Sequence, residues 1–189
     1  MHILSMTQHM LQQHGTRALG ILDSYWRDLA RDGQLPLWSD VDPGQIQDAL
    51  EYAFMADCVG RCHARLRVAG GAVSGVLGQD FHGLPLSMIV VPNERARFGA
   101  ALQRCFEDRI ALEFCLTAQK TGTRARMVLY PLADTTGTVT RILGGLVCTG
   151  DTGPCPCRFD LTDIRDLHRP YSQRPTAGNP YLRLVVNNA

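Results

Sequence analysis

The stretch from Trp26 to Gly70 constrains the fold of this chain more than any other part of it. It contains, in order, an amphipathic helical pattern, an extended link with Pro36, an Asp42-Pro43 helix start and two strand-like runs. Asp followed by Pro is typical of a helix start, because Asp caps the first turn and Pro fits the first helical position. The stretch holds no nucleophile elbow, phosphate loop or metal-binding box. It therefore indicates a sensor or interaction domain rather than an enzyme.

The first helix of this stretch is expected to begin near Thr16 and to stop at Gly33. Residues 1–15 are expected to form a short helix or a frayed terminus ended by Gly15. Apolar residues recur along the main helix at helical spacing and form a stripe that must cover a surface. We expect four members of this stripe to anchor a homodimer: Leu19, Leu22, Trp26 and Leu29.

Five segments have the alternation or the β-branched content of strands, and turn residues separate them. A helix is predicted over 95–107, and the glycine-rich segment 70–83 predicts short helical turns. The predicted strands are 53–59, 62–69, 111–119, 124–132 and 138–149.

Two strands, a helical crossover and a three-stranded meander form the order of a PAS domain. Several short motifs match that family in the same order: Tyr25-Trp26-Arg27, Asp42-Pro43, Arg65-Leu66-Arg67, Pro131-Leu132 and Ile142-Leu143-Gly144. The chain resembles the single-domain PAS proteins of alphaproteobacteria, whose functions are mostly unknown, from about Tyr25 to Thr149.

The resemblance implies an α+β fold with a five-stranded antiparallel sheet, helices over one face and the N-terminal helix near the other. We expect an N-terminal helical extension over 1–42, the PAS-like domain over 43–149 and a Pro-rich C-terminal tail over 150–189. In that tail, the apolar segment Tyr181–Val186 could add a strand to a sheet edge of its own or of a neighbour.

PAS domains act as sensory or dimerisation modules, and some bind haem, flavin or small metabolites. We therefore expect a non-enzymatic regulatory module that forms homodimers and signals through a separate partner protein. The alternative is a small-molecule sensor. No cofactor is favoured. The flavin-binding cysteine motif is missing, and a lone strand histidine such as His63 is typical of a surface or hydrogen-bonded residue. His82 is better placed near a PAS cavity, but we do not favour it as a haem ligand. The candidate cavity residues are Phe54, Leu66, Phe81, His82, Met88, Phe106, Phe114, Met127 and Leu146.

The chain has seven cysteines, and three of them are the only candidates for a metal or redox site: Cys148, Cys155 and Cys157. Zinc sites usually contain cysteine pairs separated by two to four residues, whereas one residue separates Cys155 from Cys157. An exposed dithiol that responds to oxidation is the other functional reading. We favour neither over two incidental cysteines in a linker, and no metal is expected.

Arg65 and Arg67 stand two apart on a predicted strand, so their side chains share a face. They either pair with Asp23, Asp28 or Asp40, which we favour, or bind an anionic ligand.

The formal net charge of +1 is spread along the sequence, which argues against a nucleic-acid surface. No apolar run reaches the roughly 18 residues of a membrane span. The N-terminus lacks the apolar core of a signal peptide, so we expect a cytoplasmic location.

Overall fold

The computed structural model describes residues 2–30, 34–78, 81–150, 153 and 155–168. The predicted segment Tyr181–Val186 lies outside the described residues. The α-helices are α1 (His2–Leu29), α2 (Gly71–Leu77) and α3 (Arg95–Glu107), and the short 3₁₀ helices are η1 (Trp38–Asp40), η2 (Pro43–Tyr52), η3 (Leu86–Ile89) and η4 (Pro92–Glu94). The strands are β1 (Ala53–Val59), β2 (His63–Ala69), β3 (Ala111–Thr117), β4 (Arg124–Ala133), β5 (Val139–Thr149) and β6 (Asp160–His168).

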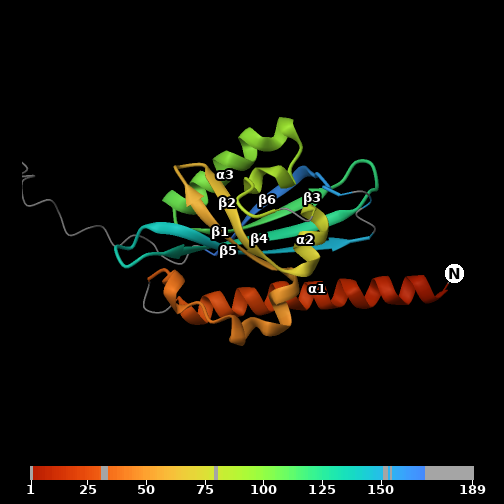
Figure 1. Ribbon diagram of the computed structural model, residues 1–189, viewed down its shortest axis with the longest axis horizontal. Coiled ribbons are helices and arrows are strands. Elements are labelled where there is room, and N and C mark those ends of the chain that lie inside the picture. The colour runs from red at the N-terminus through yellow and green to blue at the C-terminus, as the bar shows by residue number, and fades with distance from the viewer. Residues whose placement is uncertain (1, 31–33, 79–80, 151–152, 154, 169–189) are drawn as a thin grey trace, which may run out of the picture.

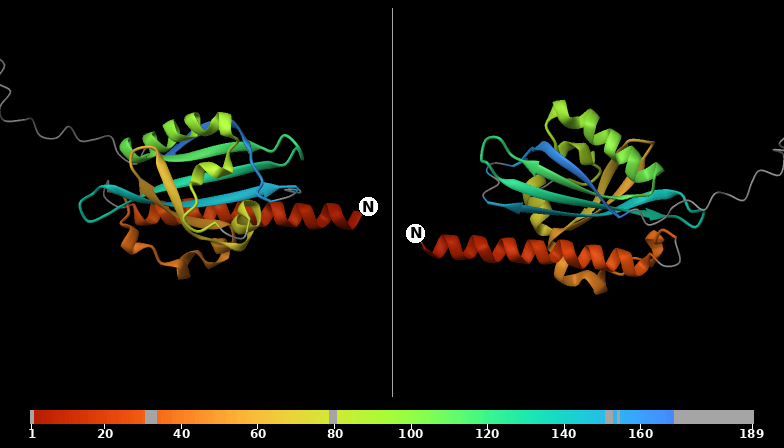
Figure 2. Two further views of the ribbon diagram at one scale, coloured as in Figure 1. Left: turned by 45° about the horizontal axis from the view of Figure 1, so that its top comes forward. Right: turned by 180° about the vertical axis from the view of Figure 1, so that it is seen from behind.

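The six strands form one antiparallel sheet in the order β2-β1-β5-β4-β3-β6. The helix α3 lies over one face of this sheet and α1 over the other (Figure 1). The two turned views in Figure 2 show the same three layers. This arrangement confirms the predicted α+β fold with the N-terminal helix on the face opposite α3. The 3₁₀ helix η2 packs beside α1 on the same face.

Tight turns connect the strands of the meander. Gly122 and Gly137 adopt positive φ angles of 69° and 81°, which glycine tolerates without a steric penalty. In the β4–β5 turn, the Asp134 carboxylate accepts hydrogen bonds from the backbone N–H groups of Thr136 and Thr138, at 2.9 and 3.1 Å. These local bonds fix the register in which β4 and β5 pair.

Two apolar layers lie on the two faces of the sheet. The layer on the α3 side includes Phe98 and Phe114, whose ring centroids are 5.2 Å apart. The layer on the α1 side includes Trp26 and Tyr130, whose ring centroids are 5.5 Å apart. The Trp26 indole N–H also donates to the Pro131 carbonyl at 3.0 Å, so this buried polar group is satisfied.

The predicted break at Gly15 is wrong, because α1 continues through this residue. Gly15 is buried against β5, and a Cβ atom there would lie 2.3 Å from Cγ1 of Val147. On the strand, a Cβ at Gly145 would lie 2.7 Å from Leu22 and 2.8 Å from Leu19. The two glycines therefore allow helix and sheet to approach closely.

The sixth strand corrects the prediction of a five-stranded sheet, since β6 falls inside the segment expected to be a tail. A bulge in the β3–β6 pairing, between Cys115 and Leu116, places Leu161 and Ile164 on the same face although they are three residues apart. Their spacing therefore lacks the alternation typical of a strand. The segment before β6 is also held in place, because the Phe159 backbone N–H donates to the Ile89 carbonyl at 2.9 Å.

Candidate functional site

Most of the residues expected to line a ligand cavity lie in the apolar layer between the sheet and α3. Six are buried there: Phe54, Leu66, Phe106, Phe114, Met127 and Leu146. Phe81 and Met88 are partly buried. His82 is exposed outside this layer, with its Nδ1 atom 3.0 Å from the Arg67 carbonyl oxygen. The structure thus brings six of the nine residues fully into one layer and leaves His82 outside it.

The packing of this layer is tight around Phe54. A Cβ atom at Gly144 would lie 2.2 Å from Cζ of Phe54, so the ring fills the space above the glycine. Hollows among the described residues lie elsewhere. One of about 310 Å³ between α1 and η2 is lined by His14, Arg17, Asp48, Glu51 and Tyr52. Another of about 500 Å³ lies between the β3–β4 turn and residues 155–158.

The residues expected to anchor a homodimer belong mainly to the core of their own chain. Leu19, Leu22 and Trp26 are at most 4% exposed and pack against the sheet, while Leu29 is partly buried. This burial corrects the expectation for the first three, because a partner could not reach them in this structure. The apolar stripe of α1 was identified correctly, but the surface that it covers is the chain's own sheet.

Three arginines surround one aspartate on the α1-side face of the sheet, at the β2 end. In the strand register, Asp57 of β1 stands directly between Arg65 of β2 and Arg141 of β5, so all three side chains share a face. Arg67 donates a charge-assisted hydrogen bond from Nε to Oδ2 of Asp57, and Nε of Arg141 lies 3.4 Å from Oδ1. We call Arg65, Arg67 and Arg141 the arginine cluster.

The predicted role of these arginines was partly right. Arg67 pairs with a carboxylate, but the partner is Asp57 rather than Asp23, Asp28 or Asp40. Asp57 and Arg141 were missed, because a cross-strand neighbour cannot be identified until the strand pairing is known.

Trp38 extends the arginine cluster toward the solvent. The Arg141 guanidinium carbon lies 3.7 Å from the Trp38 ring centroid, which is a cation–π contact. Trp38 is nevertheless 40% exposed, in contrast to Trp26 at 1%. A large aromatic side chain that is stacked on an arginine and still exposed is typical of a contact surface. The sequence contained only one hint of it, a tryptophan in a Pro-containing link.

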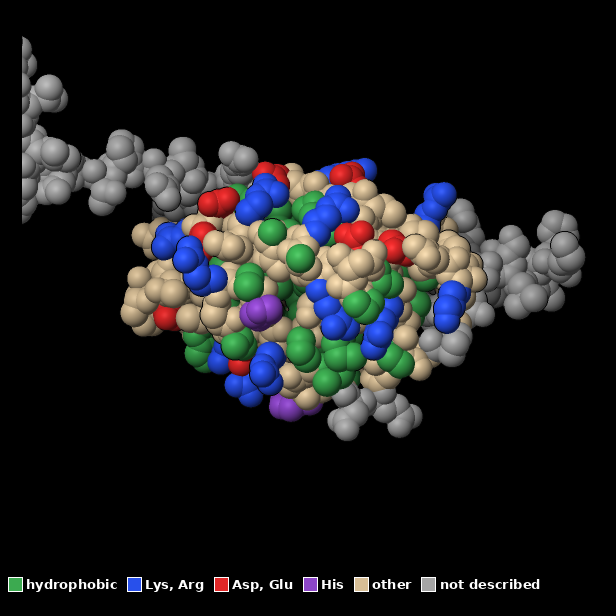
Figure 3. Space-filling model, turned by 90° about the horizontal axis from the view of Figure 1, so that it is seen from above, with side chains coloured by type: hydrophobic (Ala, Val, Ile, Leu, Met, Phe, Trp, Pro, Cys, Tyr) green, Lys and Arg blue, Asp and Glu red, His purple; other side chains and the backbone are tan. Residues whose placement is uncertain are grey.

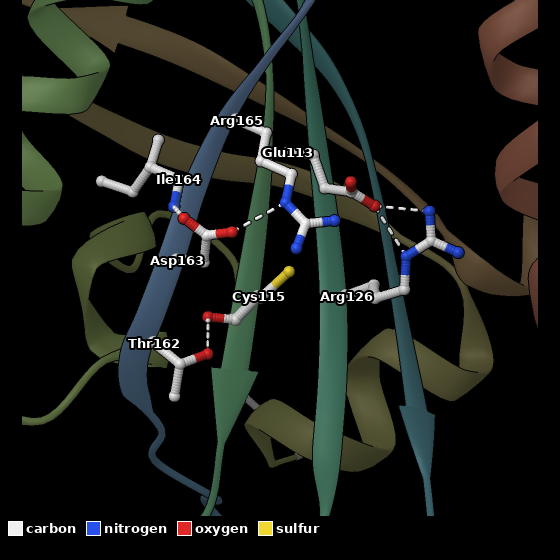
Figure 4. Close-up of polar contacts among 7 residues, drawn as sticks. All are labelled: Glu113, Cys115, Arg126, Thr162, Asp163, Ile164 and Arg165. Atoms are coloured by element: carbon white, nitrogen blue, oxygen red, sulfur yellow. Dashed lines mark hydrogen bonds and ion pairs between the residues drawn. The ribbon is translucent and has the colours of Figure 1, made fainter.

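A second polar group occupies the same face at the opposite end of the sheet, over β3, β4 and β6 (Figure 4). The carboxylate of Glu113 is almost fully buried and accepts a hydrogen bond from Nε of Arg126 at 2.6 Å. On β6, Nε of Arg165 donates to Asp163 at 2.7 Å, and this bond lowers the pKa of the Asp163 carboxyl. Each described charge of this polar group therefore has an oppositely charged partner on the same or a neighbouring strand.

The three candidate cysteines lie in different environments. Cys155 is exposed and its thiol donates to the Gly75 carbonyl of α2. Burial raises the pKa of the Cys148 thiol to about 12, with a smaller contribution from Cys157. Burial likewise raises the pKa of Cys157. Within the described part of the chain, no three His, Cys, Asp or Glu side chains are grouped so that they could hold a metal ion.

The face above α3 carries mixed charges. In Figure 3, basic side chains stand among acidic and neutral side chains on this face. Arg61 pairs with Glu107 at 2.7 Å and Arg104 pairs with Asp166 at 2.7 Å, so positive and negative charges alternate. None of the helices in the described ranges is both long and apolar enough to cross a bilayer.

The antiparallel sheet, the helical crossover between β2 and β3 and the meander that follows define an α+β domain with the element order of a PAS fold. The family model of the PAS domain matches residues 14–147. The chain therefore belongs to the PAS domain family. Neither the curated proteins nor the solved structures compared with the chain gave a match.

Proposed function

We propose that this PAS domain is a non-enzymatic regulatory module that acts through protein contacts as a homodimer. The observation that carries the proposal is the shape of α1. The helix has 28 residues, about 42 Å at 1.5 Å per residue, and its first turns run past the end of the sheet (Figure 1). Gly15 of this helix meets Val147 of β5.

The sequence of the projecting turns fits a second copy. Ile3, Met6 and Met10 recur at intervals of three and four residues, which places these positions along one side of the helix. An apolar stripe on a helix is stabilising only when another surface covers it. Two such helices related by a two-fold axis would cover one another, and two-fold dimers are the commonest oligomers.

The packing of the core supports contacts rather than a bound ligand as the basis of function. Phe54 fills the space above Gly144, and Phe98 packs on Phe114 in the layer where a PAS ligand would bind. A ligand in this layer would have to displace these rings. The packing of the core therefore favours function through contacts at the surface over function through a ligand bound in the core.

Light scattering of paired variants tests the homodimer. The double variant Met6→Glu, Met10→Glu places charges on the apolar side of the projecting turns. The matched control Gln8→Glu, Gln12→Glu adds the same charge about 200° around the helix. We expect the mass of two chains for the wild type and the control, and the mass of one chain for the Met variant.

Two results would count against this account. A wild-type mass of one chain would refute the homodimer. A dimer that persists in the Met variant would place the interface outside the projecting turns. Circular dichroism of each variant separates loss of the interface from loss of the fold.

A further inference from the structure

We propose that the arginine cluster and Trp38 form a docking surface for an acidic segment of a partner protein. The inference rests on the proposed function, because it names the chemistry of a partner for a module that acts through protein contacts. It concerns the α1-side face of β2, β1 and β5, at a distance along the sheet from the polar group of Glu113 and Arg126.

The charge balance of the surface favours a carboxylate-bearing partner. Asp57 is the only acidic side chain among the three arginines in the strand register, and it engages Arg67 and Arg141. Arg65 is exposed and makes no ion pair with any described residue. One guanidinium therefore remains available, in a group that carries three positive charges and one negative charge. Guanidinium groups bind carboxylates through paired N–H donors. Asp57 already engages two guanidinium groups at this place, those of Arg67 and Arg141.

Trp38 adds the apolar part of the surface. Its ring is held by Arg141 at 3.7 Å yet remains 40% exposed. Val68 of β2, next to Arg67, is 65% exposed. Tryptophan and arginine are the residues most enriched at the energetic centres of protein interfaces. Their combination here fits a segment in which acidic and apolar side chains are mixed.

The fixed position of the Arg141 side chain also supports a docking surface. The Asp57 carboxylate and the Trp38 ring hold Arg141 from two sides, so its side chain loses little freedom when a partner binds. Fixing a long side chain in advance removes part of the entropy cost of association. An arginine that served only for solubility would not need these two contacts.

The test is a titration of the full chain with a synthetic peptide of alternating Glu and Leu-Ser units. Tryptophan fluorescence is the signal that reports binding. Trp38 reports binding because it is exposed, whereas Trp26 is buried and contributes a constant signal. A peptide with Gln in place of each Glu is the control ligand. We expect saturable binding of the Glu peptide only, weakened when ionic strength rises from about 0.05 to 0.5 M.

Two matched variants locate the site. Arg65→Gln removes the unpaired guanidinium, and we expect it to weaken binding about fivefold, as for a partly exposed ion pair. Arg95→Gln removes the same charge from the start of α3, where Arg95 is exposed and has no ion pair with any described residue. We expect this control to bind like the wild type. Both variants should melt at the wild-type temperature.

Three results would overturn the proposal: equal binding of the Gln peptide, equal losses in the Arg65 and Arg95 variants, or tighter binding of a single-stranded oligonucleotide than of the Glu peptide. The last result would assign the surface to nucleic acid instead. If the peptide fails to bind while light scattering still gives the mass of two chains, only the acidic partner is refuted. A one-chain mass with intact peptide binding would refute the homodimer and leave the docking surface.

Discussion

At the scale of single residues, the Glu113–Arg126 pair is the most unequal ion pair of the described sheet. The Glu113 side chain is 6% exposed, whereas the Arg126 side chain is 50% exposed. Removing the arginine leaves a carboxylate in a site with little water, and removing the carboxylate leaves an arginine that water can reach. The two deletions are therefore expected to differ in cost.

We predict that Arg126→Met lowers the free energy of unfolding by about 2 kcal/mol and Glu113→Gln by about 1 kcal/mol. Urea denaturation of both variants and of the double variant measures these costs. The double variant should lose less than the sum, because the buried charge and its partner disappear together. Equal costs of the two single changes would contradict the burial argument.

Cysteine reactivity offers a second test at this scale. Burial raises the pKa values of Cys58 and Cys148 to about 12, and their thiolate fractions near neutral pH are therefore small. Cys155 is exposed. We predict that iodoacetamide at pH 8 modifies Cys155 first, and that the rates at Cys58 and Cys148 rise steadily from pH 8 to 11. Peptide mass spectrometry measures the order; faster modification of Cys148 than of Cys155 would contradict it.

At the scale of elements, Gly→Ala changes at two positions of α1 measure the effects of helix propensity and of packing separately. Gly20 has no atom within 4 Å of the position of a Cβ, so Gly20→Ala should stabilise the fold by about 0.5–1 kcal/mol through helix propensity alone. At Gly15 the same change places a methyl group 2.3 Å from Val147. The overpacking cost of about 1–3 kcal/mol should exceed the propensity gain.

We therefore predict opposite shifts in melting temperature for Gly20→Ala and Gly15→Ala. Thermal unfolding followed by circular dichroism measures both. Stabilisation by both changes would mean that α1 does not lie against β5 as described.

Residues 159–168 give the second test at the scale of elements. Phe159 is fully buried, and its backbone bonds to Ile89 and Val91. If this segment belongs to the fold, Phe159→Ala should cost about 3–5 kcal/mol, the usual loss for a buried aromatic ring. Urea unfolding with Arg158→Ala, an exposed neighbour, serves as the control. If Phe159→Ala left the free energy of unfolding almost unchanged, the segment would not be part of the folded domain.

The order of the elements was predictable because local patterns carry it. The alternation of β3 and β4 and the turn at Asp134–Gly137 depend only on neighbours in sequence. The sixth strand was not predictable, because a bulge removes its alternation and its apolar side chains become visible only beside β3. The same limit applies to Asp57, whose arginine partners come from two other strands.

Which surface α1 covers also could not be predicted from the sequence. The stripe of Leu19, Leu22 and Trp26 predicts that something covers it, but helical spacing cannot distinguish the chain's own sheet from a second copy. Only the packing against β5 decides between them.

At the scale of the whole molecule, the two surfaces proposed for protein contacts lie on different parts of the chain. The projecting turns of α1 extend beyond the sheet, and the arginine cluster with Trp38 lies on the part of the α1-side face near β2. The two places are separate, so one chain could bind a second copy and an acidic partner at the same time. A regulatory module requires this combination if a change in dimer geometry is to reach its partner.

Native mass spectrometry of the freshly purified full chain tests the central claim most directly, because it reports chain number and bound ligand together. The account predicts a species of two 20.9 kDa chains with no added mass. A species of one chain would contradict the homodimer, and a stable added mass on each chain would identify the module as a ligand sensor instead.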